Sequence, residues 1–129
     1  MASIFTKIIN REIPAYIVAE DDNYIAFLDV SPLQKGHTLV IPKVETDFIF
    51  DVEDETLTGL ILFAKQVAKK LNSAFDCNRI GMSVIGLEVP HAHIHLIPIN
   101  NMEDMMFNNP KLELTKADFL EIQSKIVKQ

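Results

Sequence analysis

The sequence predicts an α+β fold in which one long helix covers one face of a five-stranded antiparallel sheet. Short runs of β-branched and aromatic residues, separated by turn-forming residues, indicate the strands. Apolar residues that recur every 3.6 positions over one long stretch indicate the helix. The chain has 129 residues, of which 48% are hydrophobic and 23% are charged. This length and balance are typical of a single domain with one core, here residues 1–129.

The first element is a short helix close to the N-terminus. Residues 4–10 carry apolar side chains at helical spacing, and Ser3 in front of them is a good N-cap residue. The helix is expected to end before Pro14, because proline does not fit the interior of a helix.

Three strands are predicted next. Residues 16–20 and 24–28 are β-branched and aromatic runs joined by the polar stretch 21–23, which indicates a hairpin. Residues 37–41 form the third run, which Pro42 stops. These runs indicate an antiparallel meander.

The long helix begins near Asp54. Negative charge from Glu53 or Asp54 at its start, and lysines in its second half, both suit the helix dipole. The apolar positions that keep the helical period are Leu57, Leu60, Ile61, Ala64, Val67, Ala68, Leu71 and Phe75. Two more strands, residues 79–85 and 91–99, are joined by the short loop 86–90 and extend the expected meander to five strands.

The chain from about residue 101 is expected to be an extension of the domain, a loop followed by a helix. Its turn-rich part carries the soft apolar residues Met102, Met105, Met106 and Phe107. These residues either form a pocket wall or cap the core. A capping-box pattern at Thr115 and Asp118 then precedes an amphipathic helix with apolar residues Phe119, Leu120, Ile122, Ile126 and Val127.

Charge and composition exclude several classes of function. The 18 acidic residues exceed the 12 basic ones and give a net charge of -6, so that most of the surface would repel a nucleic acid. No apolar run is long enough to span a bilayer, and the first residues lack the pattern of a signal peptide. The single cysteine, Cys77, favours a reducing compartment, and a cytoplasmic location is expected. The four glycines are not grouped, which excludes Walker A and GxGxxG loops.

The candidate site is a histidine run in the last predicted strand. His91, His93 and His95 alternate with apolar residues. Side chains at i, i+2 and i+4 of a strand point to one face, so the three imidazoles are expected to form a row that is exposed to a cleft. The apolar residues between them are expected to enter the core.

Three interpretations of this row are open. A solvated, histidine-rich strand face would need no function. The HxH spacing can place two imidazoles on one zinc ion, with His95, His37 or Glu88 completing the site. In phosphoryl chemistry, one imidazole is the nucleophile and its neighbours donate hydrogen bonds to the phosphate or a proton to the leaving group. With neither a glycine-rich loop nor an acidic cluster for magnesium, the imidazoles would then carry the electrostatics.

Residues 91–97 match the pattern His-φ-His-φ-His-φ-φ, in which φ is an apolar residue. This pattern resembles the signature of the histidine triad (HIT) superfamily. Upstream blocks resemble its Hint-like branch, the nucleoside phosphoramidate hydrolases, in the same order along the chain: residues 4–9, 12–15, 20–22, 26–32 and 37–43.

The resemblance implies a hydrolase or transferase that acts on the α-phosphate of a purine nucleoside phosphoramidate, or a related nucleotide conjugate, through a covalent nucleotidyl-histidine. His93 would be the nucleophile, and its other ring nitrogen needs an acceptor such as a backbone carbonyl to fix the tautomer. His95 would hold the phosphate oxygens, and His37 would lie near the phosphate. His91 would support the neighbouring geometry. No metal or other cofactor is expected.

The resemblance also implies how the nucleoside is held. Asp29 matches the family acid that accepts hydrogen bonds from the ribose hydroxyls. The apolar cleft for the base would consist of Ile4, Phe5, Ile8, Leu28 and Val30. Without the resemblance, these five residues would be interpreted as ordinary core. Hint-like relatives are homodimers that continue the sheet across the two-fold axis, and the same is expected here.

The loop before the triad departs from the family pattern. Ile85 and Leu87 stand in a stretch where the family carries side chains that contact the phosphate and the leaving group, and they cannot donate hydrogen bonds. Glu88 would repel a phosphate when ionised, unless it donates a proton to the leaving group or binds an amine of the substrate. This departure keeps a second hypothesis open, a nucleotide-binding or regulatory module with little catalysis.

Overall fold

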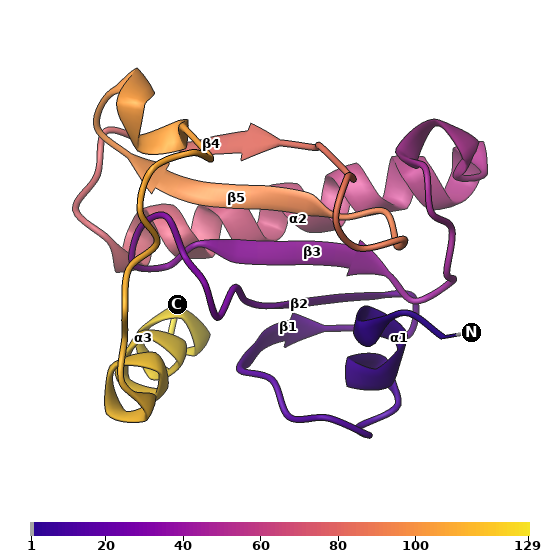
Figure 1. Ribbon diagram of the computed structural model, residues 1–129, viewed down its shortest axis with the longest axis horizontal. Coiled ribbons are helices and arrows are strands. Elements are labelled where there is room, and N and C mark those ends of the chain that lie inside the picture. Colours follow the sequence, from indigo (N-terminus) through magenta and orange to yellow (C-terminus); the bar gives the residue numbers. More distant parts are fainter. Residues whose placement is uncertain (1) are drawn as a thin grey trace.

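The computed structural model describes residues 2–129, and its elements follow one another as the sequence predicts (Figure 1). The strands are β1 (Ile17–Glu20), β2 (Tyr24–Leu28), β3 (Thr38–Pro42), β4 (Arg79–Ser83) and β5 (Ile94–Ile99). The helices are α1 (Ile4–Ile9), α2 (Asp54–Ala74) and α3 (Lys116–Val127), with two short 3-10 helices, η1 (Ile49–Asp51) and η2 (Met102–Met105). None of these helices is long and apolar enough to span a membrane. The predicted α+β class with a five-stranded antiparallel sheet is confirmed.

The strand order differs from the expected meander. It is β1-β2-β3-β5-β4, so that β5 lies between β3 and β4. β5 is buried along nearly its whole length, whereas the residues of β4 are exposed or half-buried. The more apolar strand takes the inner position, where it has a neighbouring strand on each side, and the long α2 connection lets the chain pass over that position. The meander prediction was therefore wrong for the last two strands.

Both strands of the last hairpin are shorter than predicted. β4 ends at residue 83 rather than 85, and β5 begins at Ile94 rather than at residue 91. The backbone N–H groups of His91 and Ala92 donate to the carbonyls of Val89 and Thr46, at 2.8 and 2.7 Å. Because these bonds engage the backbone outside the sheet, the first two histidines of the triad lie in the loop that enters β5.

The sheet separates two apolar clusters. α2 and α3 cover one face, where Leu60 and Leu71 pack against strand residues such as Val40 and Leu96. α1 covers part of the other face and adds Phe5 and Ile8 to a smaller cluster. In Figure 1, α2 lies behind the sheet and α1 lies in front of it. The face that carries α1 is the one that remains partly open.

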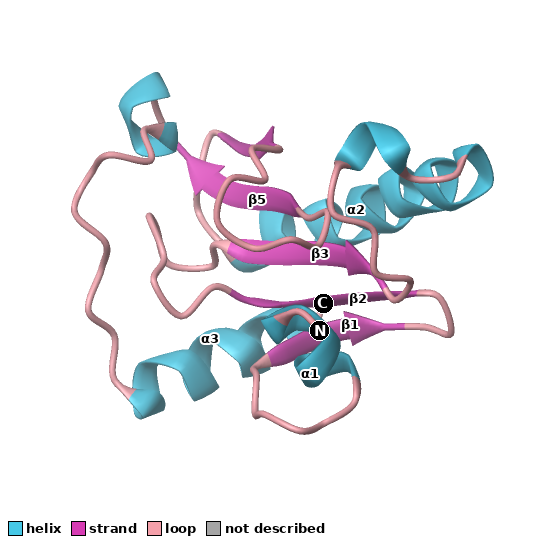
Figure 2. Ribbon diagram, turned by 45° about the vertical axis from the view of Figure 1, so that its right-hand side comes forward, coloured by secondary structure: helices cyan, strands magenta, loops and turns pink. Residues whose placement is uncertain are grey.

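The segment after β5 belongs to the packed structure. The predicted capping box is present, because Thr115 Oγ1 accepts from Asp118 N at 3.1 Å and Asp118 Oδ2 accepts from Thr115 N at 2.9 Å. Phe119, Ile122 and Ile126 of α3 enter the core that α2 covers. α3 packs against α2 and β1, and Figure 2 shows it beside β1 at the edge of the sheet.

This packing predicts that two neighbouring residues of α3 contribute very differently to the free energy of unfolding. Ile126 is 0% exposed and Val127 is 52% exposed. Ile126→Ala should lower the free energy of unfolding by about 2–4 kcal/mol, because it leaves a cavity in the core. Val127→Ala, the matched control, should change it by less than about 0.5 kcal/mol. Urea denaturation measures both values, and equal losses would contradict the described packing of α3.

Candidate active site

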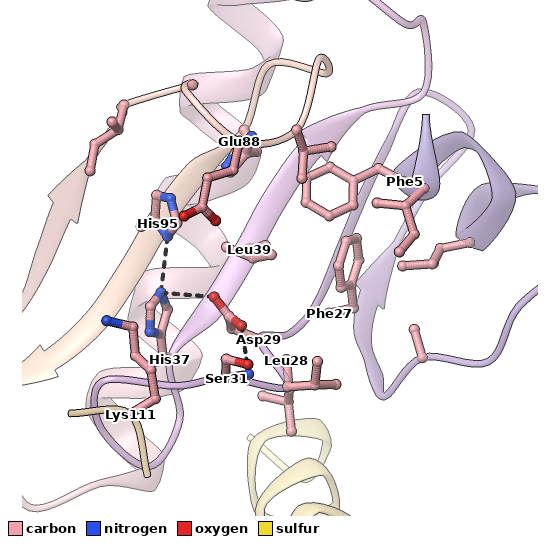
Figure 3. Close-up of a pocket in the computed structure, with 18 of the residues that line it drawn as sticks. Phe5, Phe27, Leu28, Asp29, Ser31, His37, Leu39, Glu88, His95 and Lys111 are labelled. Carbon is pink, nitrogen blue, oxygen red and sulfur yellow. Dashed lines mark hydrogen bonds and ion pairs between the residues drawn. The ribbon is translucent and has the colours of Figure 1, made fainter. Parts of the chain in front are cut away.

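A pocket of about 470 Å³ opens on the α1 face of the sheet. Its lining comes from α1 and residues 13–15 after it, from the C-terminal end of β2 and the loop that follows, from β3 and β5, from the loop before β5 and from the segment after η2 (Figure 3). One half of the pocket is apolar, and the other half carries the polar residues Asp29, Ser31, His37, Glu88, His93, His95 and Lys111. Each residue that the sequence predicted for the site lines this pocket, except His91.

The apolar half contains the five residues that were expected to hold the base. Phe5 and Ile8 are buried in the smaller apolar cluster and also line the pocket. Ile4 and Val30 line it as exposed side chains, and Leu28 reaches it from the end of β2. Core and pocket wall are therefore partly the same side chains on this face of the sheet.

His93 lies between the apolar half and the other histidines. Its ring centre is 5.0 Å from that of Phe5 and 4.9 Å from that of His95. His93 Nδ1 lies 2.7 Å from the backbone carbonyl oxygen of His91, and because a carbonyl only accepts, Nδ1 carries the proton. The lone pair of the neutral ring is then on Nε2. This carbonyl is an acceptor of the kind that the expected nucleophile needs.

The proton positions of His37 and His95 follow from a backbone donor. The N–H of Leu33 donates to His37 Nδ1 at 3.0 Å, so the proton of the neutral His37 ring is on Nε2. His37 Nε2 then donates to His95 Nδ1 at 3.0 Å. His95 consequently has its own proton on Nε2, and this N–H is available to a ligand.

Burial keeps these two rings neutral. Burial, with a smaller effect from a charge on His95, lowers the pKa of His37 to about 3. Burial, with a smaller effect from a charge on His93, lowers the pKa of His95 to about 4. At neutral pH both rings are therefore hydrogen-bond donors without positive charge.

Asp29 lies beside the histidine pair. Its Oδ1 accepts the N–H of Ser31 at 2.8 Å, and its Oδ2 lies 3.6 Å from His37 Nε2 (Figure 3). Burial raises the pKa of the Asp29 carboxyl above its ordinary value. The carboxylate keeps free acceptor positions for donors of a ligand.

Asp29, His37 and His95 are the group of described residues that could hold a metal ion, since their ligand atoms all lie within 4.8 Å of one another. A metal at His37 Nε2 needs a lone pair on that nitrogen and the ring proton on Nδ1. His37 Nδ1 instead accepts the N–H of Leu33. Ligation would therefore require an imidazolate or the loss of this bond, so the hydrogen bonds disfavour a zinc ion at these three residues.

His91 is buried outside the pocket. It is 0% exposed, and its Nε2 donates to the carbonyl of Pro42 at 2.7 Å. Its Nδ1 therefore accepts, from the Ser3 hydroxyl at 3.0 Å. The expectation of three imidazoles in one exposed row was wrong, because His91 precedes the strand and both of its nitrogens bind protein groups. Its carbonyl is the part of His91 that contacts His93.

A small polar network surrounds His91. The Ser3 hydroxyl accepts the N–H of Thr6 at 3.1 Å, which confirms the predicted N-cap. The Thr6 hydroxyl and the Ser3 N–H both donate to Glu45 Oε1 at 2.6 Å. These bonds, that from the Thr6 hydroxyl above all, lower the pKa of Glu45 to about 2. These bonds connect the start of α1 to His91, and the carbonyl of His91 connects it to His93. No sequence pattern indicated Glu45.

Two segments complete the polar half. Glu88 is an exposed residue of the loop before the triad. Phe107 brings its ring within 4.8 Å of that of His95, so this part of the methionine-rich segment is a pocket wall. Met105 packs against β4 instead. Lys111 also lines the pocket, and no pattern in the sequence distinguished it from other lysines.

Known proteins resemble this chain in sequence and in structure. Residues 10–102 match the family model of the HIT domain. A HIT-like protein of Borreliella burgdorferi is 37% identical over 131 residues, which cover 95% of this chain and 94% of that one. The purine nucleoside phosphoramidase of Escherichia coli is 39% identical over 101 residues, 74% of this chain and 85% of the relative. A crystal structure of a HIT-like protein from Bartonella henselae has a TM-score of 0.85 at 33% identity and covers 98% of this chain and 95% of its own. The chain therefore belongs to the HIT family.

The buried histidines predict how stability changes with pH. Unfolded histidines take up protons near pH 6.5, whereas in the folded protein burial lowers the pKa of His37 to about 3 and that of His95 to about 4. The unfolded chain therefore binds more protons in this window, and the free energy of unfolding should fall as the pH is lowered through it.

Urea denaturation over a pH series checks this trend, and His37→Gln should make it shallower. NMR of the ring nitrogens should find His37 and His95 as neutral Nε2–H tautomers at about pH 5. A His37 ring that titrates near its ordinary pKa would contradict the buried pair.

Proposed function

We propose that this protein hydrolyses purine nucleoside phosphoramidates, or related nucleotide conjugates, at the α-phosphate. The observation that carries the proposal is the hydrogen bond from His93 Nδ1 to the carbonyl of His91, which places the lone pair of the neutral, pocket-lining ring on Nε2, where it can act as the nucleophile. The similarity to the purine nucleoside phosphoramidase of E. coli supports this class of substrate.

The pocket offers a separate region for each part of such a substrate. The purine ring would lie in the apolar half, against Phe5 and Ile8. Asp29 would accept hydrogen bonds from the ribose hydroxyls. The α-phosphate would lie between His93 Nε2 and the Nε2–H of His95, which donates to a phosphate oxygen.

The reaction balances in two steps. First, the Nε2 lone pair of His93 attacks the α-phosphorus, a P–N bond to His93 forms, and the bond to the leaving amine breaks. The amine takes up one proton from solvent at the pocket mouth. Water then attacks the phosphorus, the bond to His93 breaks, and one proton returns to solvent. The products are the free amine, a nucleoside monophosphate and the original imidazole.

Two other histidines have positioning roles in this proposal. His37 donates to His95 Nδ1 and so directs the Nε2–H of His95 toward the phosphate. His91 holds the nucleophile through its carbonyl, while Ser3 and Glu45 anchor His91 from the start of α1. Preorganised donors of this kind stabilise the charge that develops on the phosphate in the transition state.

A nucleotide-binding or regulatory module with little catalysis is the second candidate. The observation that favours it is the loop before the triad, which lines the pocket with Ile85, Leu87 and Glu88. These side chains offer no neutral polar donor to the phosphate or the leaving group. Nucleotide affinity without turnover would distinguish this module from the hydrolase.

The first test replaces the nucleophile. His93→Ala should lower kcat for an adenosine 5'-phosphoramidate by at least about 1,000-fold, because no other residue provides the covalent intermediate. Binding of AMP should remain measurable by calorimetry. Release of the amine, followed with and without a metal chelator, measures turnover.

Cys77→Ser is the control, because this half-buried cysteine does not line the pocket. A His93→Ala protein with full turnover would contradict the assigned nucleophile. A wild-type protein that binds AMP without hydrolysing any conjugate would favour the binding module.

We also propose a homodimer that continues the sheet through β4. β4 is an edge strand, and Met82 on it is an exposed apolar residue. Lys65 of α2 and Arg79 of β4 line one surface hollow, so this side of α2 borders β4. Ile61 and Leu62 share that side by helical spacing and are exposed. A second copy would cover this apolar edge and protect it from aggregation.

Met82→Glu should shift the protein from dimer to monomer, because it brings two carboxylates and no apolar contact to the interface. Light scattering after size exclusion measures the mass at micromolar concentration. Leu120→Glu, an exposed position on α3, is the matched control. A monomeric wild-type protein would contradict the dimer.

A cytoplasmic location completes the proposal. It is supported by the single cysteine, which favours a reducing compartment. The acidic composition likewise supports a protein without a nucleic-acid partner.

A further inference from the structure

Among residues 2–129, Lys111 is the one lysine or arginine that lines the pocket. It belongs to the segment between η2 and α3, beyond the residues 10–102 that match the HIT family model. The side chain is exposed, and Figure 3 shows it beside His37. A cation thus reaches the site from a part of the chain that lies outside the family match.

The neighbouring backbone holds Lys111 in this position. Its Nζ donates to the carbonyl of Phe107, and to that of Asn109 at 3.1 Å. The next residue, Leu112, donates its N–H to the carbonyl of Pro32 at 2.8 Å, which fastens the segment to the loop that follows Asp29. An ammonium group has three N–H donors, so one remains for a ligand.

The charge of Lys111 is not neutralised by a direct partner. Within residues 2–129, it forms no ion pair with a carboxylate. His37 beside it, and His95 beyond His37, are neutral at pH 7 because burial lowers the pKa of both. Lys111 is therefore the strongest positive feature of a pocket that must receive an anionic substrate.

The position of Lys111 points to one end of the substrate. In Figure 3, Lys111 and Asp29 lie on opposite sides of His37, and Glu88 lies beside His95. If Asp29 holds the ribose, the side of Lys111 is the side of the leaving group. An anionic substituent there would approach the ammonium and avoid the carboxylates of Asp29 and Glu88.

We propose that Lys111 is a specificity-determining residue that selects nucleotide conjugates whose leaving group carries an anion, either a carboxylate or a phosphate. The proposal rests on the hydrolase function above. Its ligand is the leaving group, so the residue affects the choice among substrates and not the formation of the bond to His93.

The test compares leaving groups that differ in one charge. Adenosine 5'-phosphoramidates of glycine and of glycinamide share the scissile P–N bond, but only the glycine conjugate carries a carboxylate. Lys111→Met should lower kcat/KM for the glycine conjugate about tenfold more than for the glycinamide conjugate, the size expected for one charge-assisted hydrogen bond. Lys111→Glu should reverse the preference, and added salt should weaken it in the wild type.

Lys116→Met is the matched control, because this exposed lysine begins α3 and does not line the pocket. Hydrolysis of diadenosine triphosphate by the same variants tests a leaving group whose anion is a phosphate. A selective loss on either the glycine conjugate or the triphosphate supports the proposal and identifies the anion. Equal losses on all substrates, or none, would overturn it.

Binding separates this proposal from the proposed function. In His93→Ala protein, calorimetry gives the Kd of the glycine and glycinamide conjugates without hydrolysis. The wild type could hydrolyse neither conjugate while the ratio of the two Kd values still depends on Lys111. This result would refute the hydrolase function and support anion selection. Hydrolysis by the wild type with a Kd ratio independent of Lys111 would refute the selection alone.

Discussion

The hydrogen bond between His93 Nδ1 and the carbonyl of His91 determines which nitrogen of the central histidine can react. It forms because His91 lies in a loop and not in β5. Inside the sheet, that carbonyl would be engaged in the pairing with a neighbouring strand. The loop is fixed in turn by the backbone bond from Ala92 to Thr46 and by the bonds of the His91 ring. The orientation of the nucleophile therefore depends on β5 beginning at Ile94, after His91 and His93.

The sequence predicted the elements better than their arrangement. A run of β-branched and aromatic residues gave β2 its correct bounds, and helical periodicity gave α2 and α3. The pattern could not give the order β3-β5-β4, because local periodicity does not specify which strands are neighbours. It also led to an exposed His91, since the period-two rule assumes that the strand includes that residue. These errors arise where tertiary hydrogen bonds override a local pattern.

Site residues that lie together in one sequence motif could be predicted, whereas isolated site residues could not. The histidine triad and Asp29 were found because several reactive groups share one short motif or one recognisable block. Glu45 and Lys111 come from positions with ordinary neighbours in sequence, and the fold alone brings them to His91 and to the pocket. Phe5 and Ile8 illustrate a third case, because they are core residues and pocket wall at once. The two interpretations of an apolar residue at this site are therefore not exclusive.

The electrostatics of the pocket follow from the need for a neutral nucleophile. An imidazole attacks phosphorus only with a free lone pair, and burial of its neighbours keeps their protons from adding charge beside it. The same burial deprives the site of histidine cations that could attract a phosphate. Neutral N–H groups, such as the Nε2–H of His95, still attract the phosphate because the fold holds them in place before the substrate binds. A cation outside the buried group, at the exposed end of the pocket, supplies charge without disturbing the tautomers, and Lys111 has that position.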